Sequence, residues 1–202
     1  LRDIEALKGS KEGCAEGDCG ACTAVIGECV GGRVRYRAIN SCIQFIAMLE
    51  GKSIFTIEYL KGPRDGLHPV QQALVDEHGS QCGFCTPGFV MSLYAVYING
   101  DHLDSDSAPD QLAGNLCRCT GYGPIAAAAK RVGLLKLADW EAKQVEVDQQ
   151  WIRSQKHTEI LNIDFGGECF VSPTSVDDLA SCYEKSPDSV LVAGATDVGL
   201  WV

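Results

Sequence analysis

The chain has 202 residues and a formal net charge of −10, with 17 Lys and Arg against 27 Asp and Glu. This acidic balance argues against nucleic-acid binding, because phosphates would be repelled, and the apolar runs are too short for a membrane span. The 11 cysteines are odd in number and partly at ligand spacing, which favours reduced thiolates over a secreted disulfide framework. We therefore expect a cytoplasmic protein.

The first residues, Leu1 to Lys8, have the pattern of the end of a helix that Gly9 stops. We therefore expect that the chain starts inside a domain and that further residues precede it.

A cysteine-rich loop follows. Its spacing, Cys-x4-Cys-x2-Cys with a more distant fourth cysteine, is the plant-type signature of a [2Fe-2S] cluster. Zinc loops usually use two regular, closely spaced pairs instead. Glycines between the ligands let the backbone approach inorganic sulfides and direct N–H groups at them. The cysteines are Cys14, Cys19, Cys22 and Cys42, and the glycines are Gly13, Gly17 and Gly20.

Thr23–Cys29 and Arg33–Ile39 alternate around Gly31-Gly32, which predicts a β-hairpin with Cys29 near its turn. Cys42 then stands at the head of a predicted helix, Ser41–Glu50, that ends at Gly51.

Ser53–Tyr59 is predicted to be the last strand of the first domain, and Lys61–Gly66 the linker after it.

From Leu67 onward, the apolar residues recur at the spacing of an α-helix. Pro69 suits a first helical turn, Gly79 a stop, and Thr86-Pro87 the start of a second helix. Pro109–Ala113 and Gly123–Arg131 predict two more helices. Two short cysteine pairs stand before the second and last helices, where helix dipoles stabilise thiolates. Four converging thiolates suit an iron-sulfur cluster or zinc. These four are Cys82, Cys85, Cys117 and Cys119.

Leu134–Ile160 is polar and has little apolar periodicity beyond Trp140 and Trp151, so it is interpreted as a connector. Pro173–Asp177 has the spacing of a helix cap. Ser189–Ala193 is predicted to be a buried strand that leads into Gly194–Asp197.

Four motifs together resemble the iron-sulfur part of the molybdenum hydroxylases, and most of all the small subunit of the bacterial xanthine dehydrogenase type. The resemblance covers nearly the whole chain. The motifs are Lys11–Thr23, His68–Gln72, Ser80–Gly88 and Ala113–Tyr122.

The resemblance implies an α+β fold with a plant-type ferredoxin-like β-grasp domain, a four-helix [2Fe-2S] domain and the start of an α/β FAD-binding domain. The family's first domain has an N-terminal β-hairpin that this sequence lacks. In the family the turn Gly194, Ala195, Thr196 and Asp197 meets the flavin phosphates, and here Ala195 replaces a glycine. The implied domains are 1–61, 62–133, a linker over 134–160, and an incomplete flavin domain over 161–202.

The resemblance also implies that electrons pass from a molybdenum-pterin centre in a partner subunit through two [2Fe-2S] clusters to FAD and NAD, during hypoxanthine or xanthine oxidation in purine catabolism. Gln81 and Cys119 would lie against the pterin. No catalytic acid, base or nucleophile is expected on residues 1–131. The assembly expected is a heterotetramer of two small and two large subunits.

Two alternatives stay open: the iron-sulfur subunit of another molybdenum hydroxylase, acting on aldehydes, nicotine or carbon monoxide, and a zinc-binding interaction module. The remaining cysteines lack a partner at ligand spacing and are expected not to bind metal, and three histidines are assigned structural or exposed positions. These residues are Cys29, Cys169 and Cys182, and His68, His78 and His102.

Overall fold

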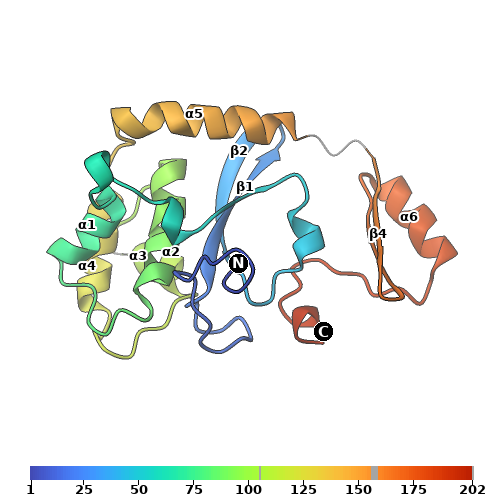
Figure 1. The fold of residues 1–202 in the computed structure, drawn as a ribbon, viewed down its shortest axis with the longest axis horizontal. Coiled ribbons are helices and arrows are strands. Elements are labelled where there is room, and N and C mark those ends of the chain that lie inside the picture. Colours follow the sequence, from blue (N-terminus) through green and yellow to red (C-terminus); the bar gives the residue numbers. More distant parts are fainter. Residues whose placement is uncertain (105, 156–158, 202) are drawn as a thin grey trace.

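The structure is a computed structural model that describes residues 1–104, 106–155 and 159–201. A small antiparallel sheet stands beside a group of helices, a long helix crosses the end of both, and a C-terminal segment extends to one side (Figure 1). The strands are β1 (Thr23–Val30), β2 (Arg33–Asn40), β3 (Ser53–Phe55), β4 (Leu161–Phe165) and β5 (Glu168–Ser172). The α-helices are α1 (Pro69–Asp76), α2 (Thr86–Asn99), α3 (Ala108–Leu112), α4 (Gly123–Val132), α5 (Asp139–Ser154) and α6 (Val176–Lys185).

The predicted hairpin is confirmed. β1 and β2 pair in register from Thr23↔Asn40 to Val30↔Arg33, and β3 adds to the other edge of β1. Gly31 and Gly32 have φ of 57° and 79°, the left-handed values that a tight two-residue hairpin turn requires. Cys29 lies exposed beside this turn, away from the ligand loop.

Two predicted helices near the first cysteine loop are wrong. Leu1–Lys8 forms turns instead, because Ala6 has a φ of 56° and the Leu7 N–H donates back to the Leu1 carbonyl. Between Ser41 and Glu50 only a short 3-10 helix forms, at Ile46–Leu49.

The predicted strand Ser53–Tyr59 is shorter than expected. β3 ends at Phe55, and a 3-10 helix over Ile57–Tyr59 follows it.

The helices predicted after Leu67 are confirmed, with small shifts at their ends. The α1 helix begins at His68, whose ring accepts from the Val70 N–H while the Gln71 side chain accepts from the His68 N–H. The α2 helix begins at Thr86-Pro87 and ends at Gly100, whose φ is 70°. These local signals specify the ends of helices independently of the rest of the fold.

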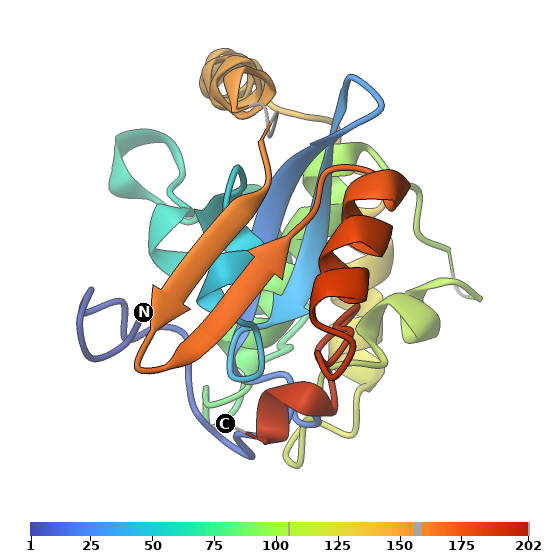
Figure 2. The same cartoon turned by 90° about the vertical axis from the view of Figure 1, so that its right-hand side faces the viewer.

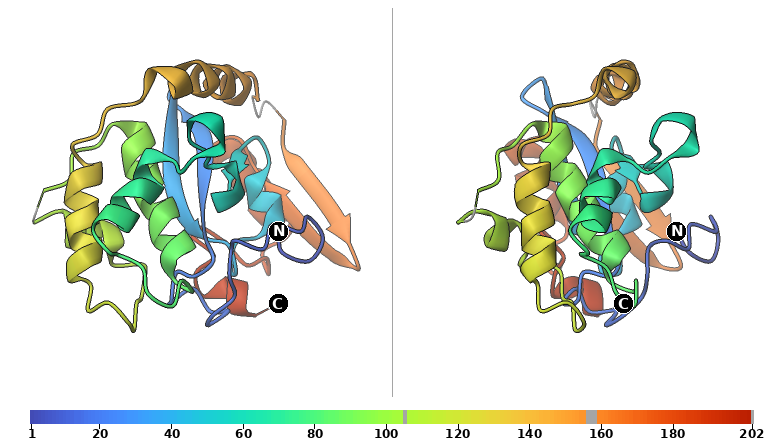
Figure 3. Two further views of the ribbon diagram at one scale, coloured as in Figure 1. Left: turned by 60° about the vertical axis from the view of Figure 1, so that its left-hand side comes forward. Right: turned by 90° about the vertical axis from the view of Figure 1, so that its left-hand side faces the viewer.

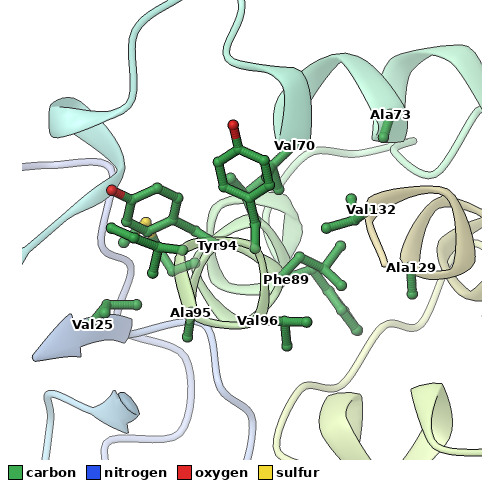
Figure 4. Packing of buried hydrophobic residues seen from close by; sticks show 14 of the residues in the cluster. Val25, Val70, Ala73, Phe89, Tyr94, Ala95, Val96, Ala129 and Val132 are labelled. Atoms are coloured by element: carbon green, nitrogen blue, oxygen red, sulfur yellow. The ribbon is translucent and has the colours of Figure 1, made fainter. Parts of the chain in front are cut away.

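The α2 helix is the centre of the core. Its residues from Gly88 to Ile98 are all buried, and Figure 3 shows α2 between the sheet and the α1 and α4 helices. In Figure 4, Tyr94 and Phe89 project from α2 among Val25 of the sheet, Val70 of α1 and Val132 of α4. Each large apolar side chain buried in this way contributes about 1.5–3 kcal/mol.

The segment 134–160, interpreted as a connector, is helical over most of its length, because the α5 helix occupies Asp139–Ser154; residues 156–158 lie outside the described residues. The buried face of α5 consists of Glu141, Val145 and Ile152. Glu141 is 4% exposed and accepts from Tyr97 Oη at 2.9 Å while lying 3.0 Å from His68 Nε2. A carboxylate therefore occupies a buried position of α5. An apolar residue at that position would have made the helical spacing visible in the sequence.

The C-terminal segment contains a second hairpin, the α6 helix and a short 3-10 helix at Val198–Leu200 (Figure 2). Gly166 and Gly167, with φ of 61° and 91°, turn β4 into β5. The α6 helix has the predicted cap, in which Ser175 Oγ accepts from the Asp178 N–H. The predicted buried strand Ser189–Ala193 does not form, and Val190 and Leu191 are 58% and 61% exposed.

Across the described ranges, no helix has both the length and the apolar character needed to cross a bilayer.

Candidate metal centres

The first cysteine loop wraps its backbone around its own sulfurs. The Cys19 N–H donates to Cys14 Sγ at 3.3 Å, and the Ala21 N–H lies 3.5 Å from Cys19 Sγ. A Cβ on Gly13 would stand 2.8 Å from Cys19 Sγ. The loop therefore leaves room for sulfur only because glycine stands at this position, as expected from the sequence.

The turn after β2 brings Cys42 to the same loop. Ser41 Oγ donates to the Cys22 carbonyl at 2.7 Å, and the Asn40 amide donates to the Gly17 carbonyl. The thiols of Cys42 and Cys22 are hydrogen-bonded to each other. Cys42 is thus placed by a strand end and two side-chain hydrogen bonds, and not by a helix start as predicted.

The second set of cysteines lies in front of two helices, as predicted. Cys85 is the residue that precedes the first turn of α2, and Cys117 and Cys119 stand just before Tyr122, which precedes α4. The thiols meet in two pairs, Cys82 with Cys119 and Cys85 with Cys117. Cys117 is held further by its N–H, which donates to Tyr122 Oη at 3.0 Å.

The sulfurs differ in acidity in the first set. Burial works to raise the pKa of Cys14, but hydrogen bonds from the backbone of Cys19, Glu16 and Asp18 outweigh it and lower this pKa to about 7. Burial, with a hydrogen bond to the Cys22 thiol, raises the pKa of Cys42 to about 12.

In the second set, too, the pKa values of the thiols shift in opposite directions. Hydrogen bonds from the Phe84 backbone and the Cys119 side chain lower the pKa of Cys82. Burial and a hydrogen bond to the Cys117 thiol raise the pKa of Cys85 to about 12. Each set therefore contains thiols whose pKa is lowered, which favours the thiolate, and thiols whose pKa is raised, which would lose their proton more readily on binding a metal.

The sulfurs do not converge on a single point. Within the described residues, no three His, Cys, Asp or Glu side chains are arranged as ligands of one metal ion. In each set the thiols lie close enough for one to act on the pKa of another: Cys19 on Cys14, Cys22 on Cys42, Cys119 on Cys82 and Cys117 on Cys85. Paired soft ligands, with glycines that admit close approach, fit a group with two metal atoms that each take two thiolates.

The two sets differ in exposure. Cys82 and Cys119 are exposed, as is Gln81, while Cys22 is 6% exposed. Large apolar side chains lie open around the second set: Phe84, Leu116 and Tyr122 are 47%, 53% and 43% exposed.

The turn at Gly194–Asp197 stands just before a segment that contacts the residue after Cys42. Its Ala195 is buried and has a φ of 59°, a left-handed value that favours glycine. Four residues after Ala195, the backbone of Gly199 lies so close to Ile43 that a Cβ would stand 2.6 Å from the Ile43 carbonyl oxygen. This segment therefore reaches the residue that follows Cys42.

Other predicted residues lie apart from both sets. Cys29 and Cys169 are exposed and Cys182 is half-buried, and His78 and His102 are exposed. His68 is buried as the cap of α1. Sequence reasoning missed Asn115, which is 4% exposed and hydrogen-bonded to the first loop. Its only signal is its place between Gly114 and the Cys117 pair.

The family described as "[2Fe-2S] binding domain" matches residues 56–130. The chain is similar to a xanthine dehydrogenase of Drosophila subobscura, with 47% identity over 127 residues, which make up 62% of this chain and 9% of that protein. It is also similar to aldehyde oxidase 1 of Oryctolagus cuniculus, with 46% identity over 132 residues, which make up 64% of this chain and 10% of that protein. The chain thus spans about a tenth of the length of these curated relatives.

Among solved structures, quinoline 2-oxidoreductase from Pseudomonas putida 86 has a chain that superposes with a TM-score of 0.56 at 30% identity, over 74% of this chain and 82% of that one. The aldehyde oxidoreductase from Desulfovibrio gigas superposes with a TM-score of 0.55 at 36% identity, over 66% of this chain and 14% of that one. With its mixed α and β architecture and paired cysteines, the chain belongs to the molybdenum hydroxylase family of xanthine dehydrogenases and aldehyde oxidases, as an iron-sulfur electron-transfer part.

Proposed function

We propose that this chain carries two [2Fe-2S] clusters and transfers electrons within a xanthine dehydrogenase-like enzyme. The observation that carries the proposal is that the fold gathers the eight motif cysteines in two places, a loop closed by the turn after β2 and the starts of α2 and α4. When bound, each cluster supplies a site that takes up and releases one electron. The proposed ligands are Cys14, Cys19, Cys22 and Cys42 for one cluster, and Cys82, Cys85, Cys117 and Cys119 for the other.

The positions of the two cysteine sets support a direction of electron transfer. Gln81 and Cys119 lie exposed beside an open apolar side chain, Phe84, which suits contact with a partner. The first set lies deeper, and beyond it Ile43 touches the segment that follows Gly194–Asp197. Electrons would enter at the second set, pass to the first and leave toward a flavin.

In the wider enzyme we place the molybdenum-pterin centre in a partner subunit, where hypoxanthine or xanthine is oxidised. FAD would bind where Gly194–Asp197 and residues outside this chain meet, and NAD would be the final acceptor. A cytoplasmic heterotetramer of two small and two large subunits, acting in purine catabolism, completes the proposal. The similarity to proteins named xanthine dehydrogenase supports it.

A second candidate substrate class rests on an equally direct likeness. Aldehyde oxidase 1 and quinoline 2-oxidoreductase are similar to this chain as well, so an aldehyde or N-heterocycle hydroxylase would use the same electron path. The residues that select the substrate would lie where it binds, in the partner subunit. Assaying the intact enzyme with xanthine, an aldehyde and quinoline, with NAD as acceptor, separates these candidates.

The first test is metal content. The purified protein should contain about four irons and about four acid-labile sulfides per chain in these modules, and should be brown-red. After reduction it should show two paramagnetic signals. A colourless protein with bound zinc would favour the interaction module and refute the proposal.

The second test concerns Gln81. Its amide can both donate and accept at a pterin edge, and the side chain is exposed. Changing Gln81→Leu should leave both clusters in place and slow reduction of the second set by substrate, or weaken molybdenum retention. Gln111→Leu, at another exposed glutamine of the helical region, is the control. Unchanged reduction rates and molybdenum content in Gln81→Leu would exclude a pterin contact at this residue.

A further inference from the structure

The side chain of Asn115 lies between the two cysteine sets. It is 4% exposed, and its Nδ2 donates to the Gly20 carbonyl and to Thr23 Oγ1, both at 3.0 Å. Its Oδ1 accepts from Ser92 Oγ of the α2 helix at 2.6 Å. Both donors and the acceptor of the amide are therefore used, so its orientation is fixed.

The backbones of the two ligand regions also meet here. The Leu116 N–H donates to the Cys19 carbonyl at 2.9 Å. A Cβ on Gly88 would stand 2.2 Å from the Gly20 carbonyl oxygen, and a Cβ on Gly20 would stand 2.2 Å from the Gly114 carbonyl oxygen. Glycine alone permits contact this close between the first loop, the start of α2 and the segment before Cys117.

Asn115 is close in sequence to one set and bonded to the other. Gly20 directly follows Cys19, and Asn115 stands two residues before Cys117. A shift of this amide is therefore transmitted through a few covalent bonds to a sulfur of each set. No side-chain atom of Asn115 is hydrogen-bonded to a cysteine sulfur in the described structure.

We infer that Asn115 is a positioning residue that sets the distance and orientation between the two metal centres, and hence the coupling through which an electron passes from one to the other. This inference rests on the proposed function, because it requires a cluster in each set. Removing the amide would leave the carbonyl of Gly20 and the hydroxyls of Thr23 and Ser92 without this shared partner, so the loops would move apart.

The test uses the intact protein, fully reduced with dithionite. Two reduced clusters at fixed separation split each other's paramagnetic signals at low temperature, and this magnetic interaction falls with the inverse cube of their distance. Asn115→Leu keeps the side-chain size but removes all three hydrogen bonds, and Ser92→Ala removes the one that orients the amide. We expect loss or marked narrowing of the splitting in Asn115→Leu and a smaller change in Ser92→Ala, with both signals retained.

Asn99→Leu is the matched control. Asn99, at the end of α2, is likewise an asparagine whose amide makes side-chain hydrogen bonds, accepting from the Tyr36 N–H at 3.1 Å and donating to the Tyr36 carbonyl at 2.8 Å, but these bonds hold the edge of β2 and not a ligand loop. If Asn115 acted only on general stability, both variants would lower the melting temperature and neither would alter the splitting.

Unchanged splitting in folded Asn115→Leu would overturn the inference, and so would loss of only one signal, since Asn115 would then support one loop alone. If Asn115→Leu does not fold, Ser92→Ala decides the matter by the same criterion. Failure of the proposed function is distinguishable, because the unsubstituted protein would then lack two signals from the start.

Discussion

The two cysteine sets, which we propose as cluster ligands, are built on different backbone designs. The first is a glycine-containing loop closed by the turn after β2, and its sulfurs receive backbone N–H groups of the loop itself. The second consists of two short pairs in front of α2 and α4, where helix starts supply free N–H groups and a favourable dipole. Glycine in the first loop leaves room for a sulfur, at Gly13, whereas Gly83 and Gly121 beside the second set adopt left-handed φ with open space around them.

The two cysteine sets also differ in how far the surrounding fold encloses them. The first set is linked to the rest of the fold by Asn40, Ser41 and Asn115, while Cys82 and Cys119 of the second lie exposed. Substitutions in the first loop should therefore disturb more structure than equivalent changes in the second.

The largest effect is expected for Gly20→Ala, because this substitution should disturb both cysteine sets. Its φ is 68°, and the new Cβ would collide with the Gly114 carbonyl at 2.2 Å. Left-handed strain and overpacking together should lower the free energy of unfolding by about 2–5 kcal/mol, with loss of iron from both sets. Thermal unfolding and iron analysis measure this.

Gly121→Ala is the control for that change. Its φ is 67°, almost the same, but nothing lies within 4 Å of its Cβ, so only the conformational cost of about 1–2 kcal/mol remains. Equal destabilisation by the two substitutions would show that the close contact between the loops is not important.

The next largest effect distinguishes the two cysteine sets from each other. Cys14→Ser should remove only the first cluster and Cys85→Ser only the second, so that iron falls from about four to about two per chain in either case. Each variant should lose a different paramagnetic signal. If one substitution removed both signals in a folded protein, the two sets would not be independent sites.

A smaller effect compares Gly13→Ala with Gly83→Ala. The first places a Cβ 2.8 Å from Cys19 Sγ, whereas Gly83, with a φ of 83°, has open space around its Cβ. Gly13→Ala should weaken retention of the first cluster, and Gly83→Ala should cost about 1–2 kcal/mol of backbone strain with iron retained. Iron release to a chelator measures both. Faster release from Gly83→Ala would contradict the proposed difference between loop and helix start.

The smallest effect is expected for the cysteines outside both sets. Cys29 and Cys169 are exposed and Cys182 is half-buried, so serine at all three should leave iron content and the visible spectrum unchanged. A fall in iron would mean that one of them belongs to a set.

What the sequence determined by itself is local. Gly31-Gly32 specifies a hairpin turn, Pro69 and Thr86-Pro87 specify helix starts, and the spacing of the cysteines predicts two groups of ligands. Each of these signals depends on φ preferences, caps or the reach of a few residues, so it can be recognised before the rest of the fold is known.

The tertiary structure decided the features that depend on distant partners. The α5 helix was missed because its buried face includes Glu141, which is stable there only through His68 and Tyr97 of two other helices. Ser189–Ala193 has the composition of a strand, but a strand needs a neighbour to pair with its backbone, and the described chain places none beside it. Asn115 likewise has no recognisable pattern of its own, because the partners that give it a role, Gly20 and Thr23, lie far away in sequence and meet it only in the folded chain.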